Sequence, residues 1–445
     1  MTPHHSNAAD DGDSHRTPGT DAVRHVNNAK RRRTATPAPR LNGGPLTAAK
    51  GTWEKLEIGA GSEAPAARWG AASCLLTEEG EVRPGRPSPA DRRRPAGPRR
   101  DAPAGGAPPP PPATSPPPPA TSPPPTPPPQ GPRLFVVGGE GEGGYLSDTW
   151  VLDVERGSWE RTLSVDNGGR AWHSLFVAGG TAGCPQLMSF GGERGPGGEG
   201  GPEAPSEVLN EMGAYDVECM LWYYPEIERA ADFGAVPARA GHTTCVLRDG
   251  RVLVFGGVDG AGGFTNRTFV FSPSALRWES PSRHELRGAP PKPRAYHGAV
   301  QVGERLVVFG GAGKHTWSLK EVYTLDLGTW KWTEHTSSVQ GDVPAPRFSH
   351  GAVALDGARV LVFGGWDPTT EPASHFADAA VLDVSTWTWS RVELGPGGPG
   401  AVAGHCMGRV APRGGEPGVL VFGGRTPGGG YSADAYVLRV SPAAP

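Results

Sequence analysis

The sequence predicts an all-β protein in which small antiparallel sheets repeat around a ring. Six glycine pairs each end a short apolar run, at intervals of 53 to 65 residues along the chain. These runs are too short for buried helices, and regularly spaced short strands are typical of a radially repeated sheet. The long stretches "PRAYHGAVQVGERLVVFGG" and "PRFSHGAVALDGARVLVFGG" are two copies of one such unit.

Each unit contains signals for four strands, a to d. Strand a starts with an Arg-x-x-His pattern such as "RAYH", and strand b is the apolar run that ends in the glycine pair. Strand c is a short run such as "VYTLDL", and strand d carries a tryptophan after a turn. The residues expected to be structural are therefore the glycines Gly138, Gly139, Gly191, Gly192, Gly256, Gly257, Gly310, Gly311, Gly364, Gly365, Gly423 and Gly424, with the tryptophans Trp53, Trp159, Trp222, Trp278, Trp332 and Trp389.

This pattern resembles the kelch family of β-propellers. The glycine pairs, the aromatic or Asp-bearing third strand and the tryptophan of the fourth strand carry the resemblance, which covers about 51–76 and 132–441. The third unit departs from it, because Phe271-Ser272-Pro273 stands where a Tyr-x-x-Asp-like strand is usual. The resemblance implies a kelch propeller, and neither a BTB nor an F-box domain is evident beside it.

The register of the units predicts six blades closed in a circle. The last glycine pair, at Gly424, has no tryptophan after it, whereas Trp53 in "GTWEKLEIG" has no glycine pair before it. We therefore expect the strand around Trp53 to complete the last blade beside "AYVLRV", which would cover an open sheet edge and join the two ends of the chain. The predicted domain consists of residues 51–76 and 133–441.

Two segments outside the repeats are expected to be disordered. Residues 1–50 are polar and contain Lys30, Arg31, Arg32 and Arg33, either a solvated basic tail, a nuclear-import signal or a kinase site at Thr34. Residues 77–132 are rich in Arg and then Pro, and the second part should form polyproline II. This insertion can be a spacer, a ligand for an aromatic groove of the SH3 or WW type, or a translated intron.

Composition places the protein in a broad class. The net charge of -3 gives no global attraction to nucleic acid or membranes, and the five cysteines form no CxxC pair. No apolar stretch is long enough to cross a membrane and the N-terminus has no secretion signal, so we expect a cytoplasmic protein, with a nuclear location as the alternative.

The candidate partner site is a set of arginines at the starts of the innermost strands. They would surround the mouth of the central channel and bind an acidic peptide or another anion, and some members of the resembled family hold acidic peptides with arginines in this region. The alternative is that each arginine pairs with a carboxylate or carbonyl of a neighbouring blade's loop. The members are Arg68, Arg170, Arg239, Arg294 and Arg347, and the sixth unit has Val402 instead.

The histidines three residues later are interpreted as packing residues rather than ligands. An odd separation along a strand directs the arginine and the histidine of each unit to opposite sides. The first unit has Ala71 at this position, and the others have His173, His242, His297, His350 and His405.

The loops between strands b and c are the other candidate for recognition, because long loops on a rigid scaffold often bind partners. Trp366 and Asp367 are assigned to partner binding there, together with the arginines. Glu371, His375 and Asp378 nearby do not keep the order of the Glu-x-x-x-Asp-x-x-x-His iron pattern of some plant kelch proteins, so no metal is predicted. "GGEGEGG" matches a dinucleotide fingerprint by letters, but a strand follows it where that motif requires a helix.

The function predicted from these features is a protein-interaction module. No nucleophile motif such as GxSxG is present, no cofactor is implied, and the expected partner is a protein or acidic peptide bound by a monomer. The alternative is an enzyme or metal-dependent specifier on the same fold, as in oxidases with a copper radical site and sialic-acid epimerases, because fold alone does not determine chemistry.

Overall fold

A computed structural model describes the repeat region of the chain. The described residues are 49–59, 62–76, 131–162, 169–179, 185–195, 206–228, 236–279, 286–411 and 416–441. The predicted disordered segments 1–50 and 77–132 lie outside the described residues, apart from 49, 50, 131 and 132.

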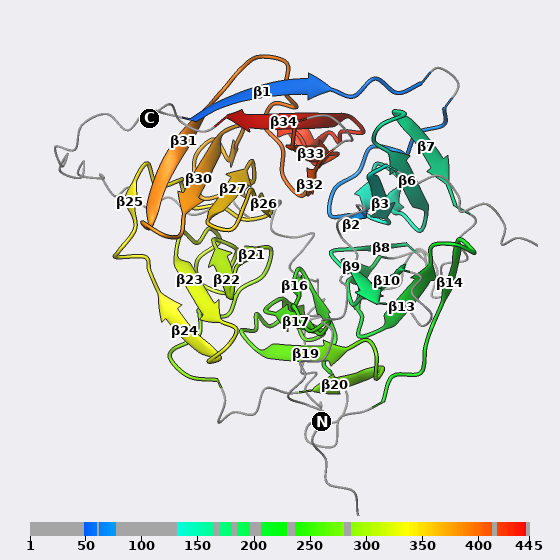
Figure 1. Ribbon diagram of the computed structural model, residues 1–445, viewed down its shortest axis with the longest axis horizontal. Coiled ribbons are helices and arrows are strands. Elements are labelled where there is room, and N and C mark those ends of the chain that lie inside the picture. The colour runs from blue at the N-terminus through cyan, green and yellow to red at the C-terminus, as the bar shows by residue number, and fades with distance from the viewer. Residues whose placement is uncertain are drawn as a thin grey trace, which may run out of the picture.

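The strands form six four-stranded antiparallel units around a ring (Figure 1). Blade 1 contains β2 (Ala72–Leu76), β3 (Arg133–Val137), β6 (Thr149–Asp153) and β7 (Ser158–Arg161). Blade 2 contains β9 (Ser174–Gly179), β10 (Pro185–Phe190), β13 (Met212–Asp216) and β14 (Leu221–Tyr223). Blade 3 contains β16 (Thr243–Val246), β17 (Val252–Phe255), β19 (Thr268–Ser272) and β20 (Arg277–Glu279).

The second half of the ring repeats this order. Blade 4 contains β21 (Gly298–Val302), β22 (Arg305–Phe309), β23 (Val322–Asp326) and β24 (Lys331–Glu334). Blade 5 contains β26 (Gly351–Ala354), β27 (Arg359–Phe363), β30 (Ala379–Asp383) and β31 (Thr388–Leu394). Blade 6 contains β32 (Cys406–Val410), β33 (Gly418–Phe422), β34 (Ala435–Ser441) and β1 (Ala49–Lys55).

The loops contain additional short strands. They are β4 (Glu140–Gly141), β5 (Gly144–Tyr145), β8 (Arg170–Ala171), β11 (Glu193–Arg194), β12 (Glu207–Val208), β15 (Arg239–Ala240), β18 (Val258–Asp259), β25 (Gln340–Gly341), β28 (Trp366–Asp367) and β29 (Ser374–His375). The helix in the described ranges is a single 3₁₀ turn, η5 (Pro427–Gly429), and no helix there is long and apolar enough to cross a membrane.

The N-terminal strand closes the ring as predicted. β1 pairs antiparallel with β34, with Trp53 opposite Leu438. β1 also continues in parallel along the end of β31, so blades 5 and 6 share one sheet. The edge of β34 is thereby covered, and β1 becomes the outer strand of blade 6.

A closed circle of backbone hydrogen bonds joins the six blades at their inner edge. One residue near the start of each inner strand donates its N–H to the carbonyl of the corresponding residue in the preceding blade, at 2.7–2.9 Å. All six have φ between 51° and 63°, which lets the chain turn toward its neighbour. This left-handed conformation costs a residue other than glycine about 1 kcal/mol. The members are Gly70, Trp172, Gly241, Tyr296, Ser349 and Gly404.

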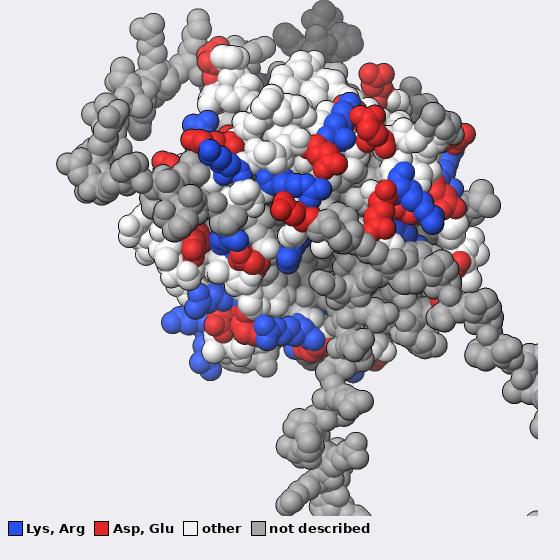
Figure 2. Space-filling view, turned by 45° about the horizontal axis from the view of Figure 1, so that its top comes forward, with Lys and Arg blue, Asp and Glu red and all other residues white. Residues whose placement is uncertain are grey.

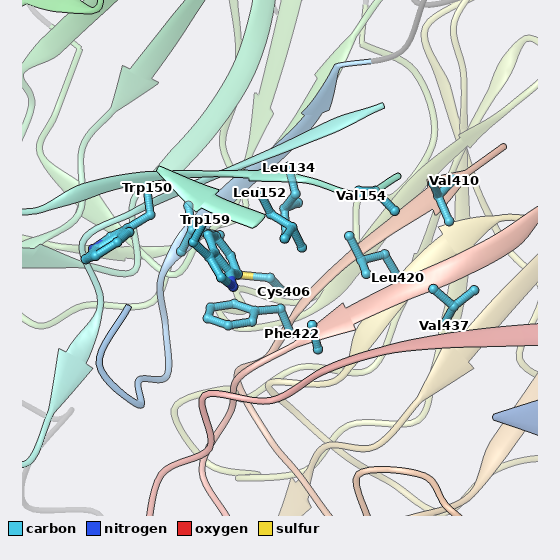
Figure 3. Packing of buried hydrophobic residues seen from close by; sticks show 12 residues of the cluster. Leu134, Trp150, Leu152, Val154, Trp159, Cys406, Val410, Leu420, Phe422 and Val437 are labelled. Atoms are coloured by element: carbon cyan, nitrogen blue, oxygen red, sulfur yellow. The ribbon is translucent and has the colours of Figure 1, made fainter. Parts of the chain in front are cut away.

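The core lies between the blades rather than within them. In five of the six blades the tryptophan of the outer strand packs on the phenylalanine before the glycine pair of the preceding blade, with ring centroids 4.8–5.2 Å apart. Figure 3 shows this contact for Trp159 of blade 1 and Phe422 of blade 6, with Cys406 beside them. Blade 1 has Val137 in place of the phenylalanine, and Trp222 of blade 2 packs on Tyr215 instead. The interblade contacts follow the circular register, because Trp53 lies 5.2 Å from Phe363 of blade 5.

The glycine pairs have positive φ and pack closely against backbone carbonyls and, in most blades, against histidines. Gly256 has φ 71°, and a Cβ there would lie 2.7 Å from both the Arg294 carbonyl oxygen and Cε1 of His297 in the next blade. Gly257 has φ 102°, and a Cβ there would lie 3.0 Å from the Cβ of His242 in its own blade. The glycine pair and the histidine are therefore two halves of one interblade contact.

Candidate functional site

The five arginines predicted to bind a partner are buried. Their exposed fractions are 0–2%, so they do not form an open ring at the mouth of the channel. Four of them donate from Nη1 to the carbonyl of the first glycine of a pair in the same blade, at 2.8–3.2 Å. The burial corrects the expectation of an arginine ring at the channel mouth, and the alternative is corrected too, because the partners lie in the arginine's own blade and not in a neighbouring one. The four are Arg68, Arg239, Arg294 and Arg347.

A carboxylate just before strand c completes the pairing in four blades. Arg68 binds both oxygens of Asp148 at 2.6 and 3.0 Å, and Arg347 binds both oxygens of Asp378 at 2.8 and 3.0 Å. In blades 2 and 4 the pairs are Arg170–Glu211 at 3.0 Å and Arg294–Glu321 at 3.7 Å. Sequence reasoning missed these acids, although each immediately precedes a recognisable third strand.

The Arg68–Asp148 pair shows what the pairing does electrostatically. Burial alone would raise the pKa of Asp148, but hydrogen bonds and charge from Arg68, with a bond from Trp150, bring the pKa below its usual value. The carboxylate is therefore ionised at neutral pH, and the charge of the buried guanidinium is compensated inside the blade.

Blade 3 breaks this rule. The residue before its third strand is Arg267, which is exposed, so the buried Arg239 has a second cation where the other blades have an acid. Among the described residues, neither arginine forms an ion pair with a carboxylate within 4.0 Å. Both guanidiniums instead lie over the ring of Phe269, 4.6 and 4.9 Å from its centroid.

The charge of Arg239 in blade 3 is only partly compensated. Burial and the charge of Arg267 lower the pKa of Arg239 to about 10, against a smaller opposite effect of Asp259. Asp259 uses Oδ1 to accept the backbone N–H groups of Ala261 and Gly263, at 3.0 and 2.8 Å. A site with two guanidiniums on one aromatic ring is chemically suited to a carboxylate or another anion.

Blade 6 shows the opposite substitution. Val402 occupies the arginine position, and Asp434 before the third strand binds Lys55 of the closing strand β1 at 2.8 Å. Asp434, which has no arginine partner in blade 6, thus holds the N-terminal strand. Arg239 and Arg267 of blade 3 form no comparable ion pair within the described residues.

The histidines occupy the walls of the channel as packing groups. All five are buried, and burial lowers their pKa values, that of His405 to about 4. His242 and His297 each exchange a hydrogen bond with a hydroxyl of the preceding blade, Ser174 at 3.0 Å and Thr243 at 2.9 Å. The imidazoles are therefore neutral at pH 7 and link neighbouring blades.

The central cavity is too small for a peptide. It has a volume of about 140 Å³ and is lined by Ala71, the histidines and the six residues of the backbone circle. Trp172 and Tyr296 pack against each other across it at 4.8 Å. Pockets for drug-sized ligands have about 300–1,000 Å³, so this cavity is smaller than a usual ligand pocket.

Trp366 and Asp367, also predicted to bind a partner, are buried at 7% and 5% exposure. Trp366 packs on Phe348, and Asp367 accepts hydrogen bonds from Ser318 and Thr369. Both residues therefore hold the loop in place. Within the described ranges, no group of three or more His, Cys, Asp or Glu side chains is placed to hold a metal ion.

The "GGEGEGG" stretch is a loop with a small hairpin. β4 and β5 pair through Glu140 and Tyr145, and the chain then enters strand β6. A helix does not follow, so the helix N-terminus that would hold a pyrophosphate is not provided here.

Comparison with known proteins identifies the family. The model described as the KLHDC2/KLHL20/DRC7 Kelch-repeats domain matches residues 181–413, which is more than half of the chain. The protein therefore belongs to the kelch-repeat family, and its fold is a kelch β-propeller.

Two related proteins are aligned over part of their length. Acyl-CoA-binding domain-containing protein 5 of Arabidopsis thaliana is 30% identical over 317 residues, which are 69% of this chain and 45% of that protein. Rab9 effector protein with kelch motifs of Gallus gallus is 32% identical over 48% of this chain and 51% of its own. The chain thus spans about half the length of these relatives.

A solved structure supports the fold alone. The structure of YjhT aligns with a TM-score of 0.51 at 18% sequence identity, over 69% of this chain and 94% of that one.

Proposed function

We propose that this protein is a protein-interaction propeller that binds an acidic segment of its partner at blade 3. The partner approaches the face that carries the b–c loops, and a carboxylate of the partner lies between Arg267 and Arg239. The observation that carries the proposal is the replacement of the blade 3 acid by Arg267. A family that commonly mediates protein binding supports the general role.

The geometry of the other blades defines what the ligand must supply. In blade 1 a carboxylate lies 2.6 Å from the guanidinium of Arg68 and completes a pair that is almost fully buried. A side-chain carboxylate, or the carboxylate of a chain end, placed beside the exposed Arg267 would fill the corresponding position in blade 3. Arg267 supplies the accessible donor, and Arg239 adds a buried positive charge behind it.

The charge distribution of the surface favours a local rather than a global attraction. Basic and acidic side chains lie next to one another over the face seen in Figure 2, and neither sign forms a continuous field in that view. Specificity for an acidic segment would therefore come from the two arginines of blade 3 and not from the net charge of -3. The cytoplasmic or nuclear location and the monomeric state stay predictions.

Selection from a random peptide library against the intact protein tests this proposal. We expect enrichment of Asp, Glu or a free C-terminal carboxylate, and weaker binding at higher salt because the contact is ionic. The double variant Arg239→Met, Arg267→Ser should lose this enrichment.

The matched control is Arg305→Ser, which removes an exposed arginine at the start of β22. Arg305 lies on the face that carries the loops between strands a and b, opposite the face proposed to bind the partner. The proposal fails if selection yields no acidic preference, or if Arg305→Ser reduces binding as much as the blade 3 variant.

A further inference from the structure

The outer strands of five blades protect their exposed edges with polar side chains. On each of these strands the buried or half-buried tryptophan is flanked on both sides by polar or charged residues. Such residues are the usual protection of a sheet edge against association. The flanking pairs are Ser158 and Glu160, Arg277 and Glu279, Lys331 and Thr333, Thr388 and Ser390, and Thr52 and Glu54.

The outer strand of blade 2 is different. In β14, Trp222 is flanked by Leu221 and Tyr223, with exposed fractions of 53% and 42%, and Tyr224 follows at 40%. Three of the five exposed large apolar side chains in the described part of the chain lie in these four residues. A concentrated apolar patch at one rim position indicates a surface that is covered by something.

The long insertion of the chain starts and ends on blade 1, next to the blade that carries this patch. Leu76, the last residue before the insertion, packs in the same apolar cluster as Met220 and Trp222 of blade 2. Leu221 lies at the same end of the propeller, because it pairs with Asp216 next to the turn between β13 and β14. β14 is at the outer rim of blade 2, and the strands that flank the insertion, β2 and β3, are the two inner strands of the neighbouring blade 1 (Figure 1).

The composition of the insertion matches the chemistry of the patch. Residues 108–129 contain only Pro, Ala, Thr and Ser, and they end two positions before Gly131, where the described chain resumes. A polyproline II segment of this length spans up to about 68 Å at 3.1 Å per residue, which is ample to reach a neighbouring blade. Uncharged proline-rich segments dock on surfaces formed by aromatic side chains, as in SH3 and WW domains.

We propose that residues 108–129 of this chain bind across Leu221, Tyr223 and Tyr224 on the rim of blade 2. Tethering at Gly131 gives the segment an effective concentration in the millimolar range, so even a weak contact is largely occupied. This surface is separate from the arginines of blade 3, and the contact does not depend on the partner proposed above.

The first test compares the full-length protein with a variant in which residues 108–129 are replaced by Gly and Ser at equal length. Hydrogen–deuterium exchange of the peptides that cover 221–224 is measured in both. We expect several-fold faster exchange in the variant, at all protein concentrations. Equal exchange would overturn the proposal, and protection that appears only at high concentration would assign the contact to a second molecule and also overturn it.

The second test uses a synthetic peptide of residues 108–129 as the probe. It should bind the Gly/Ser variant at least tenfold more tightly than the intact protein, whose own segment competes. Adding Leu221→Arg and Tyr223→Glu to the Gly/Ser variant should abolish binding. These changes copy the Arg277–Trp278–Glu279 arrangement that blade 3 already tolerates, so the fold should be retained, as a thermal melt will show. Unchanged peptide binding by this variant would contradict the proposal.

Discussion

Blade 1 and blade 3 place the same buried arginine at the same position, but they surround it with opposite charges. In blade 1, Arg68 donates to the Gly138 carbonyl and to both oxygens of Asp148. In blade 3, Arg239 donates to the equivalent Gly256 carbonyl and has Arg267 where the acid would be. Backbone carbonyls and the ring of Phe269 therefore hold the guanidinium of Arg239 without an acid, and the position before strand c can change its charge without loss of the blade.

This difference distinguishes positions that interblade packing fixes from a position that can vary between blades. The glycine pairs, tryptophans and histidines are tied to one another by interblade contacts, so a change in one demands a change in another. The side chain before strand c contacts groups of its own blade: Asp148 binds Arg68 and Trp150, and Asp434 binds Lys55. It is therefore the position at which one blade can gain a binding role while the others keep a structural one.

Lowering the pH should produce the largest loss of folding stability. Each of blades 2 to 6 contains a buried histidine at the position where blade 1 has Ala71, so five blades should respond to acid and blade 1 should not. Burial keeps the pKa of each of these histidines well below 6.5 in the folded state. The unfolded chain binds protons at these side chains below about pH 6.5 and the folded chain does not, so stability present above that pH is lost as the pH falls. Five groups amount to as much as about 7 kcal/mol per pH unit.

Urea unfolding between pH 7.5 and pH 5.5 measures this loss. His242→Gln removes one titrating group and should reduce the pH dependence by about a fifth. A midpoint that stays constant over this range would mean that the histidines are not buried as described.

Removal of the buried arginine should reduce the free energy of unfolding much more in blade 1 than in blade 3. Arg68→Met leaves Asp148 as an uncompensated, mostly buried carboxylate and should destabilise the protein by about 3 kcal/mol. Arg239→Met removes a cation that has no acid and replaces it with an apolar side chain beside Phe269, so it should cost less than about 1 kcal/mol. The two free energies of unfolding from urea titrations decide this, and equal losses would show that the missing acid is energetically unimportant.

The architecture could be predicted from the sequence because the repeated residues, glycine pairs and tryptophans, each have a strict geometric role. The glycine pairs and tryptophans gave the number of blades, and the unmatched Trp53 gave the closing strand that pairs with β34. The histidines were correctly interpreted as packing groups, since they repeat with the glycines that they contact.

The site was harder to predict because a side chain's exposure depends on its partners. The arginines were expected at an open channel mouth, but acids such as Asp148 and Asp378 bury them in ion pairs. Trp366 and Asp367 were likewise expected on an exposed loop, yet they pack into it. The signal that matters is a single residue, Arg267, and its meaning appears only when the same position is compared across blades.

The most direct measurement of the central claim is the charge reversal Arg267→Glu. It gives blade 3 the acid that blade 1 has, so a new internal pair with Arg239 should raise the free energy of unfolding by about 1 kcal/mol. The same change should abolish binding of the acidic peptides selected against the intact protein. A variant that is no more stable and still binds those peptides would contradict the account.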